Sequence, residues 1–227
     1  MALLRTTALP RFARCGVRRR TPIRWADVGA IDPELLRQTL ITELSAAWQT
    51  LKLAHAGEQF YSFGFYTAEL AEYLMVTAST EEGLAQVVGQ YLAGQGGDPQ
   101  LTRASLRWSP CDSPLHLEGE LLLPESGRLR AAGPDPYDDT REAEESVALV
   151  FDTAVAALGH LDQEGTFGPD ADRNRLVLGV WKGDQSDEER VEFVRKLNPA
   201  AVAKHFAHEL EAGTEAFFEL SRQRATK

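Results

Sequence analysis

Apolar side chains recur every three or four positions along three long stretches of the chain, the spacing of a helix with one buried face. The pattern predicts helices over residues 33–57, over 140–165 and from 199 onward, and Asp32 before Pro33 is a helix-start signal. The predicted buried stripes consist of Leu36, Leu40, Leu44, Trp48 and Leu51, of Val147, Phe151, Val155, Leu158 and Leu161, and of Val202, Phe206 and Leu210.

Capping residues predict where further helices begin. Ser79 with Glu82, and Ser186 with Glu189, have the spacing of a capping box, and Thr140 is a suitable cap for the middle long helix. The helix that begins at Ser79 is expected to end at the glycines Gly94, Gly96 and Gly97.

Segments with the alternation or the aromatic content of strands lie between these helices. Residues 59–67 and 72–78 are expected to form an antiparallel pair. Residues 101–108, 117–123 and 176–181 are expected to form further strands.

Helices with one apolar face, beside strands of mixed pattern, predict a single α+β domain in which amphipathic helices pack on a mixed or antiparallel sheet. Residues 124–139 are rich in proline and acids and are expected to form a polar connection. We therefore expect a basic and disordered arm over residues 1–29, one domain over 30–220 and a tail over 221–227.

Charge is distributed unevenly along the chain. The first 26 residues hold seven of the 24 basic residues and none of the 34 acidic ones, so they carry +7 and residues 27–227 carry −17. Such an acidic body is repelled by phosphates and attracted to positively charged surfaces. The composition argues against nucleic-acid binding by the body and favours a basic protein partner.

The acid-free, arginine-rich start of the chain is typical of an organellar transit peptide, but it lacks the serines of one and the apolar core of a secretion signal. Three interpretations stay open: a mis-called start or a disordered arm, a targeting segment, and a contact with nucleic acid or membrane.

Cysteine usage and hydropathy bear on the compartment. Cys15 and Cys111 are the only cysteines and lie far apart, whereas small secreted domains are rich in cysteine. No run of 18 apolar residues is present. We expect a cytoplasmic protein without a membrane span, and the sequence does not fix its oligomeric state.

Two groups of residues have nearly the spacing of metal ligands. His205 and His208 lie three positions apart with Glu209 next, whereas helical zinc motifs place histidines four apart with Glu between them. Residues 170–174 have calcium-loop spacing, but arginine stands at the sixth position and tryptophan at the twelfth, where Gly and Glu are needed. No phosphate-binding loop is present either, so we expect no metal and no cofactor.

One constellation is a candidate for chemistry, since no nucleophile motif is present and neither cysteine has a recognisable histidine partner. Asp162 and Glu164 lie at the end of a helix, where the dipole disfavours negative charge. A structural ion pair with Arg173, or with Arg107 beside Trp108, is expected to compensate them. The alternative is a ligand-binding or acid/base site.

Five short segments carry a further signal. They are FYSFGFYT (60–67), ASTEEGL (78–84), LRWSP (106–110), LDQEGTFG (161–168) with Arg173, and LNP (197–199). In this order they resemble the motifs of the mainly bacterial domain-of-unknown-function family 4303, over about residues 35–210. The chain departs from the family at Ser79, where Asn is usual, and after LRWSP, where a second aromatic residue is missing. The resemblance implies fold and boundaries rather than an activity.

Three classes of function remain. The first is a non-catalytic interaction protein, such as a toxin-neutralising immunity protein or an adaptor, with Trp108 or Trp181 as interface anchor if either is exposed. The second is a small enzyme that uses Glu164, Asp162 and Arg107 beside Trp108. The third is a structural subunit.

Removal of the residues before Ala26 is expected to leave the melting temperature unchanged, because seven like charges do not pack together without partners. Thermal unfolding of the full and shortened chains checks this. A loss of more than about 2 kcal/mol in the free energy of unfolding would mean that the arm is docked.

Overall fold

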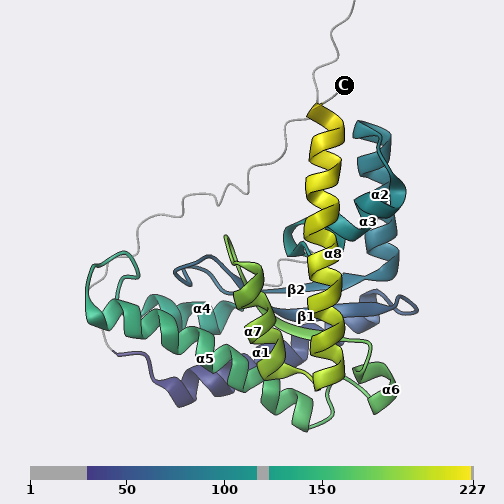
Figure 1. Cartoon of the computed structure of the whole chain (residues 1–227). Helices are drawn as coiled ribbons and strands as arrows, with labels where there is room; N and C mark the ends of the chain where they lie inside the picture. The colour runs from purple at the N-terminus through teal and green to yellow at the C-terminus, as the bar shows by residue number, and fades with distance from the viewer. Residues whose placement is uncertain (1–29, 117–122, 226–227) are drawn as a thin grey trace, which may run out of the picture.

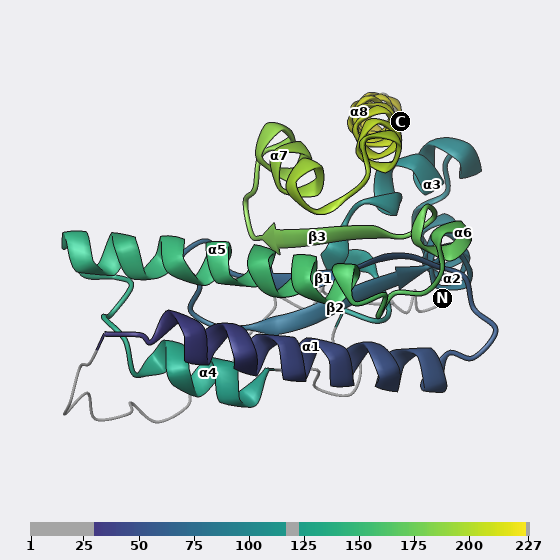
Figure 2. The same cartoon turned by 90° about the horizontal axis from the view of Figure 1, so that it is seen from below.

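A three-stranded mixed sheet lies between two layers of helices (Figure 1 and Figure 2). The structure is a computed structural model, and it describes residues 30–116 and 123–225. The central strand β1 (Phe60–Thr67) pairs antiparallel with β2 (Met75–Thr80) and parallel with β3 (Val177–Lys182). The predicted α+β class, with amphipathic helices on a mixed sheet, is confirmed.

The helices of the described residues cover both faces of the sheet. Figure 2 shows α1 and α5 on one side of the strands and α7 and α8 on the other. None of these helices is both long and apolar enough to cross a lipid bilayer. The helices are α1 (Pro33–Ala54), α2 (Glu81–Gln95), α3 (Pro99–Arg107), the 3-10 helix η1 (Pro110–Asp112), α4 (Pro124–Ala131), α5 (Arg141–Gln163), α6 (Asp170–Arg173), α7 (Asp187–Leu197) and α8 (Ala200–Ala225).

Successive side chains of β1 point to opposite faces of the sheet, and the hydrophobic core consists of two clusters. Phe63 and Phe65 are fully buried in a cluster with the apolar stripes of α1 and α5, whereas Tyr66 belongs to a second cluster with α2, α3 and α8. Every residue of β1 is buried, so both of its faces are covered. The indole of Trp48 joins the first cluster and donates a hydrogen bond of 3.1 Å to the carbonyl of Thr166, which ties α1 to the end of α5.

A pair of glycines allows β1 and β3 to approach under the second cluster. Gly64 and Gly179 are partners in the parallel register. A Cβ at Gly64 would overlap the carbonyl oxygen of Gly179, and a Cβ at Gly179 would overlap the ring of Trp181. The missing side chains therefore leave the space in which Trp181 packs on the sheet.

Three helices with a capping residue in the local sequence, α1, α5 and α7, begin where predicted. Asp32 accepts hydrogen bonds from the backbone of Glu34 and Leu35, and Thr140 accepts one from Ala143. The capping box that starts at Ser186 is complete. The α2 helix is capped by Thr80 instead of Ser79, so that prediction was wrong by one residue.

The strand predicted over residues 101–108 is a helix, α3. Asp98 caps it through the backbone N–H groups of Gln100 and Leu101, and Pro99 stands at its first position. The buried residues Thr102 and Leu106 lie four apart, the spacing of a helix and not of a strand.

The predicted connection over residues 124–139 also contains a helix, α4. Its N-terminal cap is Glu43 of α1, which accepts hydrogen bonds from the backbone of Glu125 at 2.8 Å and of Ser126 at 3.1 Å. A cap from another helix leaves no local sequence signal. Most of the strand predicted over 117–123 lies outside the described residues.

Gly64→Ala is expected to lower the free energy of unfolding by about 3 kcal/mol or more, because the added methyl meets backbone that cannot move aside. Gly159→Ala is the matched control, since a Cβ there meets open space on α5, and it is expected to stabilise by up to about 1 kcal/mol. Urea unfolding of both variants checks this, and equal stabilities would contradict the close approach of β1 and β3.

Candidate functional site

The predicted constellation of charged residues is divided in the structure. Arg173 is buried and forms an ion pair with Asp162, with a second contact of 3.0 Å between Nη2 and Oδ2. It also donates to the carbonyls of Leu176 and Leu197 and to Oδ1 of Asn198. Arg173 thus joins the end of α5 to the start of β3 and to the α7–α8 junction, as the structural interpretation predicted.

Glu164 lies outside this network. Its side chain is 58% exposed and approaches only Nε2 of His160, at 3.2 Å, among the interactions described. The two carboxylates that the sequence paired therefore have different surroundings, and only Asp162 contacts Arg173.

Arg107 belongs to another cluster, where α2, α3 and α8 meet. Its guanidinium contacts Glu81 at 2.9 Å and Glu209 at 3.0 Å, and lies 4.4 Å from the ring centroid of Tyr61. Burial acts to lower the pKa of Arg107, but the two carboxylates raise it overall, so the group stays charged. With two carboxylates already bound, Arg107 connects helices and is a poor binding site for an anionic ligand.

Trp108 and Trp181, the candidate interface anchors, lie in the core. They are 8% and 3% exposed, and both contact the ring of Phe206. Their indole N–H groups have no hydrogen-bond partner among the described residues. Since both residues are buried, neither meets the condition for an anchor.

A cluster that the sequence did not indicate lies around Cys111. Its thiol is 3.1 Å from the Tyr66 hydroxyl, and the Tyr66 ring packs edge-on against His116 at 4.5 Å between centroids. Burial lowers the pKa of His116, which favours the neutral imidazole, and Nδ1 of His116 contacts Thr77. The described contacts of the His116 ring are thus with Tyr66 and Thr77.

The described residues contain no group of three or more His, Cys, Asp or Glu side chains placed to hold a metal ion. His205 and His208 are both exposed on α8, and His205 approaches Glu209 at 3.4 Å.

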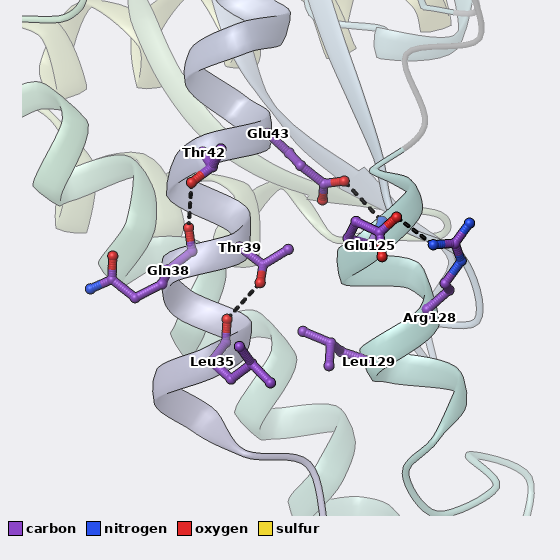
Figure 3. Close-up of a pocket in the computed structure, with 8 residues that line it drawn as sticks. All are labelled: Leu35, Gln38, Thr39, Thr42, Glu43, Glu125, Arg128 and Leu129. Atoms are coloured by element: carbon purple, nitrogen blue, oxygen red, sulfur yellow. Dashed lines mark hydrogen bonds and ion pairs between the residues drawn. The ribbon is translucent and has the colours of Figure 1, made fainter.

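A shallow hollow of about 560 Å³ separates α1 from α4 (Figure 3). Its polar groups are already used within the protein: the hydroxyls of Thr39 and Thr42 donate to carbonyls of α1, and Glu43 caps α4. Figure 3 shows the aliphatic side chains of Leu35 and Leu129 at one end of the hollow. This surface offers little for specific recognition.

A second hollow lies where the start of the described chain meets the α4–α5 connection, and Figure 2 shows these segments side by side. Buried Arg130 shapes it by donating to the carbonyls of Pro134 at 3.0 Å and Ala71 at 3.2 Å. A Cβ at Gly133 would overlap the side chain of Ile31, so glycine lets Ile31 pack against this connection. Arg130 and Ile31 thus both contact the α4–α5 connection and fix its position.

We call this hollow the acidic groove, and its volume is about 780 Å³. Asp138 and Glu142 on its rim are exposed, and their side-chain carboxylates have no hydrogen-bond or ion-pair partner among the described residues. Glu145 is paired only with the exposed Arg141, a contact that contributes little. The lining residues are Ala30, Ile31, Pro134, Asp135, Asp138, Thr140, Glu142, Glu145, Ser146 and Leu149.

Ser146 is a further lining residue without a partner. It is 7% exposed, and its hydroxyl has no hydrogen-bond partner among the described residues. A buried hydroxyl left unpaired costs about 1–3 kcal/mol, so a ligand that pairs with it recovers part of this cost. The acidic groove therefore combines unpaired carboxylates, an apolar floor and an unpaired hydroxyl.

Comparison with known proteins adds a family. A family model described as "Domain of unknown function (DUF4303)" matches residues 41–199. Searches of curated proteins and of solved structures found no match to the chain.

Asp162→Ala is expected to lower the free energy of unfolding by about 3 kcal/mol, because it leaves the buried guanidinium of Arg173 without its carboxylate. Glu164→Ala, two residues away and exposed, is the control and is expected to change it by less than about 0.5 kcal/mol. Urea unfolding distinguishes them, and similar losses would contradict the division of the two carboxylates.

Proposed function

The chain belongs to the family described as a domain of unknown function (DUF4303), and on this premise we propose that it acts by binding a basic protein partner. A toxin-neutralising immunity protein and an adaptor are the two specific forms of this function. Either form requires an exposed recognition surface of suitable charge, and neither requires a reaction.

The charge of the chain beyond residue 26 supports this proposal. Residues 27–227 carry −17, so their field accelerates encounter with a positive surface and discourages contact with nucleic acid. Specific binding also needs a local site, because a uniform field does not select one partner orientation.

The acidic groove is the observation that carries the proposal. Asp138 and Glu142 expose charge that no described residue neutralises, beside the apolar side chains of Ile31 and Leu149. By contrast, Arg107 and Arg173 already have carboxylate partners. Asp162 and Arg107, two of the groups that the enzyme interpretation needs, are thus engaged in joining elements, whereas the carboxylates of Asp138 and Glu142 have no partner among the described residues.

The test is capture of partners by the full chain from its source cells, identification by mass spectrometry, and measurement of association rates with increasing salt. We expect a partner with a positively charged surface, and an association rate that falls about tenfold or more from low to physiological ionic strength. If the chain is an immunity protein, the partner is expected to be a toxin encoded by a neighbouring gene.

Two outcomes would contradict the proposal. One is a partner whose association rate does not change with salt concentration. The other is turnover of a small molecule that Glu164→Gln abolishes while circular dichroism shows an intact fold.

A further inference from the structure

The acidic groove has the parts needed to hold one long cationic side chain. Arginine and lysine combine a charged head group with an apolar stem, which lies along apolar surface while the head group stays among polar groups. Ile31 and Leu149 supply apolar surface, and Asp138, Glu142 and Glu145 supply carboxylates within the same groove.

Ser146 gives an independent reason to place a ligand here. Its hydroxyl is buried on the groove side of α5 without a partner, and a hydroxyl oxygen accepts a hydrogen bond from guanidinium or ammonium N–H groups. A cationic head group therefore pairs with both the carboxylates and the hydroxyl, whereas an apolar ligand leaves the carboxylates of Asp138 and Glu142 and the hydroxyl of Ser146 without a partner.

We infer that the acidic groove binds an arginine or lysine side chain of a partner protein, with its stem on Ile31 and Leu149 and its head group between Glu142 and Ser146. This inference rests on the proposed function and specifies its site. The volume of about 780 Å³ also leaves room for residues that flank the cation in the partner.

Charge decides between this occupant and others. A second copy of the chain would bring another acidic body of −17 to an acidic surface, which is unfavourable. The arginines of residues 1–26 also carry positive charge, so the experiment must distinguish their binding in the groove from that of a partner.

The experiment is an NMR titration of the full chain with N-acetyl-arginine amide, and with the uncharged N-acetyl-citrulline amide as the matched ligand. We expect saturable shifts of backbone amides within residues 134–149 with the arginine compound, and binding about tenfold weaker with the citrulline compound. The same titration with N-acetyl-lysine amide is expected to resemble the arginine result.

Two variants with the same change of net charge locate the site. Asp138→Asn, Glu142→Gln and Glu145→Gln together are expected to weaken binding about tenfold or more. Glu188→Gln, Glu211→Gln and Glu215→Gln neutralise three exposed carboxylates on α7 and α8, and are expected to weaken it less than about twofold because salt screens distant charges. Equal effects of the two variants would overturn the groove as the site.

Ser146→Ala separates a ligand contact from a structural role. Removal of an unpaired buried hydroxyl is expected to raise the melting temperature and, at the same time, to weaken binding of the arginine compound a few-fold. A stabilised variant with unchanged binding would overturn the role of Ser146.

The remaining outcomes identify other occupants. In one outcome the backbone amides of the groove do not shift with the arginine compound, but do shift when the seven N-terminal arginines of the full chain are changed to glutamine. The occupant is then the chain's own arm, and the inference is wrong. Shifts that depend on protein concentration would indicate a second copy and would also overturn it. A basic partner captured equally by the groove variant would overturn this inference while the proposed function stands.

Discussion

Burial of β1 on both faces is the constraint on which the rest of the molecule depends. A central strand with its neighbours on both sides and helices above and below is buried along its whole length, so its phenylalanine and tyrosine rings pack within the two core clusters. The covering helices must each turn an apolar stripe inward. Trp108 and Trp181 belong to these inner layers, which is why two large aromatic residues contribute to stability and not to a surface.

The burial of β1 also determines where charged side chains lie. Arg173 and Arg107 lie at places where several elements meet the ends of the sheet, and Arg173 is paired there with one carboxylate and Arg107 with two. Breaking such a pair leaves a buried charge uncompensated, so these two arginines stabilise the fold. The acidic excess is left to the outer faces of the helices and to the α4–α5 connection, where Asp138 and Glu142 are free to meet a partner.

Local signals in the sequence predicted the parts of the fold that local interactions determine. Asp32 before Pro33, Thr140, and Ser186 with Glu189 each cap the helix that follows them, so α1, α5 and α7 could be placed. The α4 helix could not be predicted, because its cap, Glu43, lies 82 positions from Glu125. The α3 helix was missed although Asp98 and Pro99 mark its start, since the residues after them were interpreted as a strand.

The contacts of the candidate site could likewise be predicted only where the partners lie close together in the sequence. The pair of Asp162 and Arg173 lies 11 positions apart and was one of two predicted pairings. The contact of Arg107 with Glu209 spans 102 positions, and the acidic groove joins Ile31 to Leu149, so neither has a pattern in the sequence. The acids of residues 135–145 were visible as charge, but only the fold shows that they border an apolar floor.

Hydrogen–deuterium exchange of the full chain, alone and with its captured partner, tests the central claim most directly. The account predicts that the partner slows exchange in residues 134–149, at the α4–α5 connection and the first turns of α5. Protection confined to α3 and α8 around Arg107, with residues 134–149 unchanged, would contradict it.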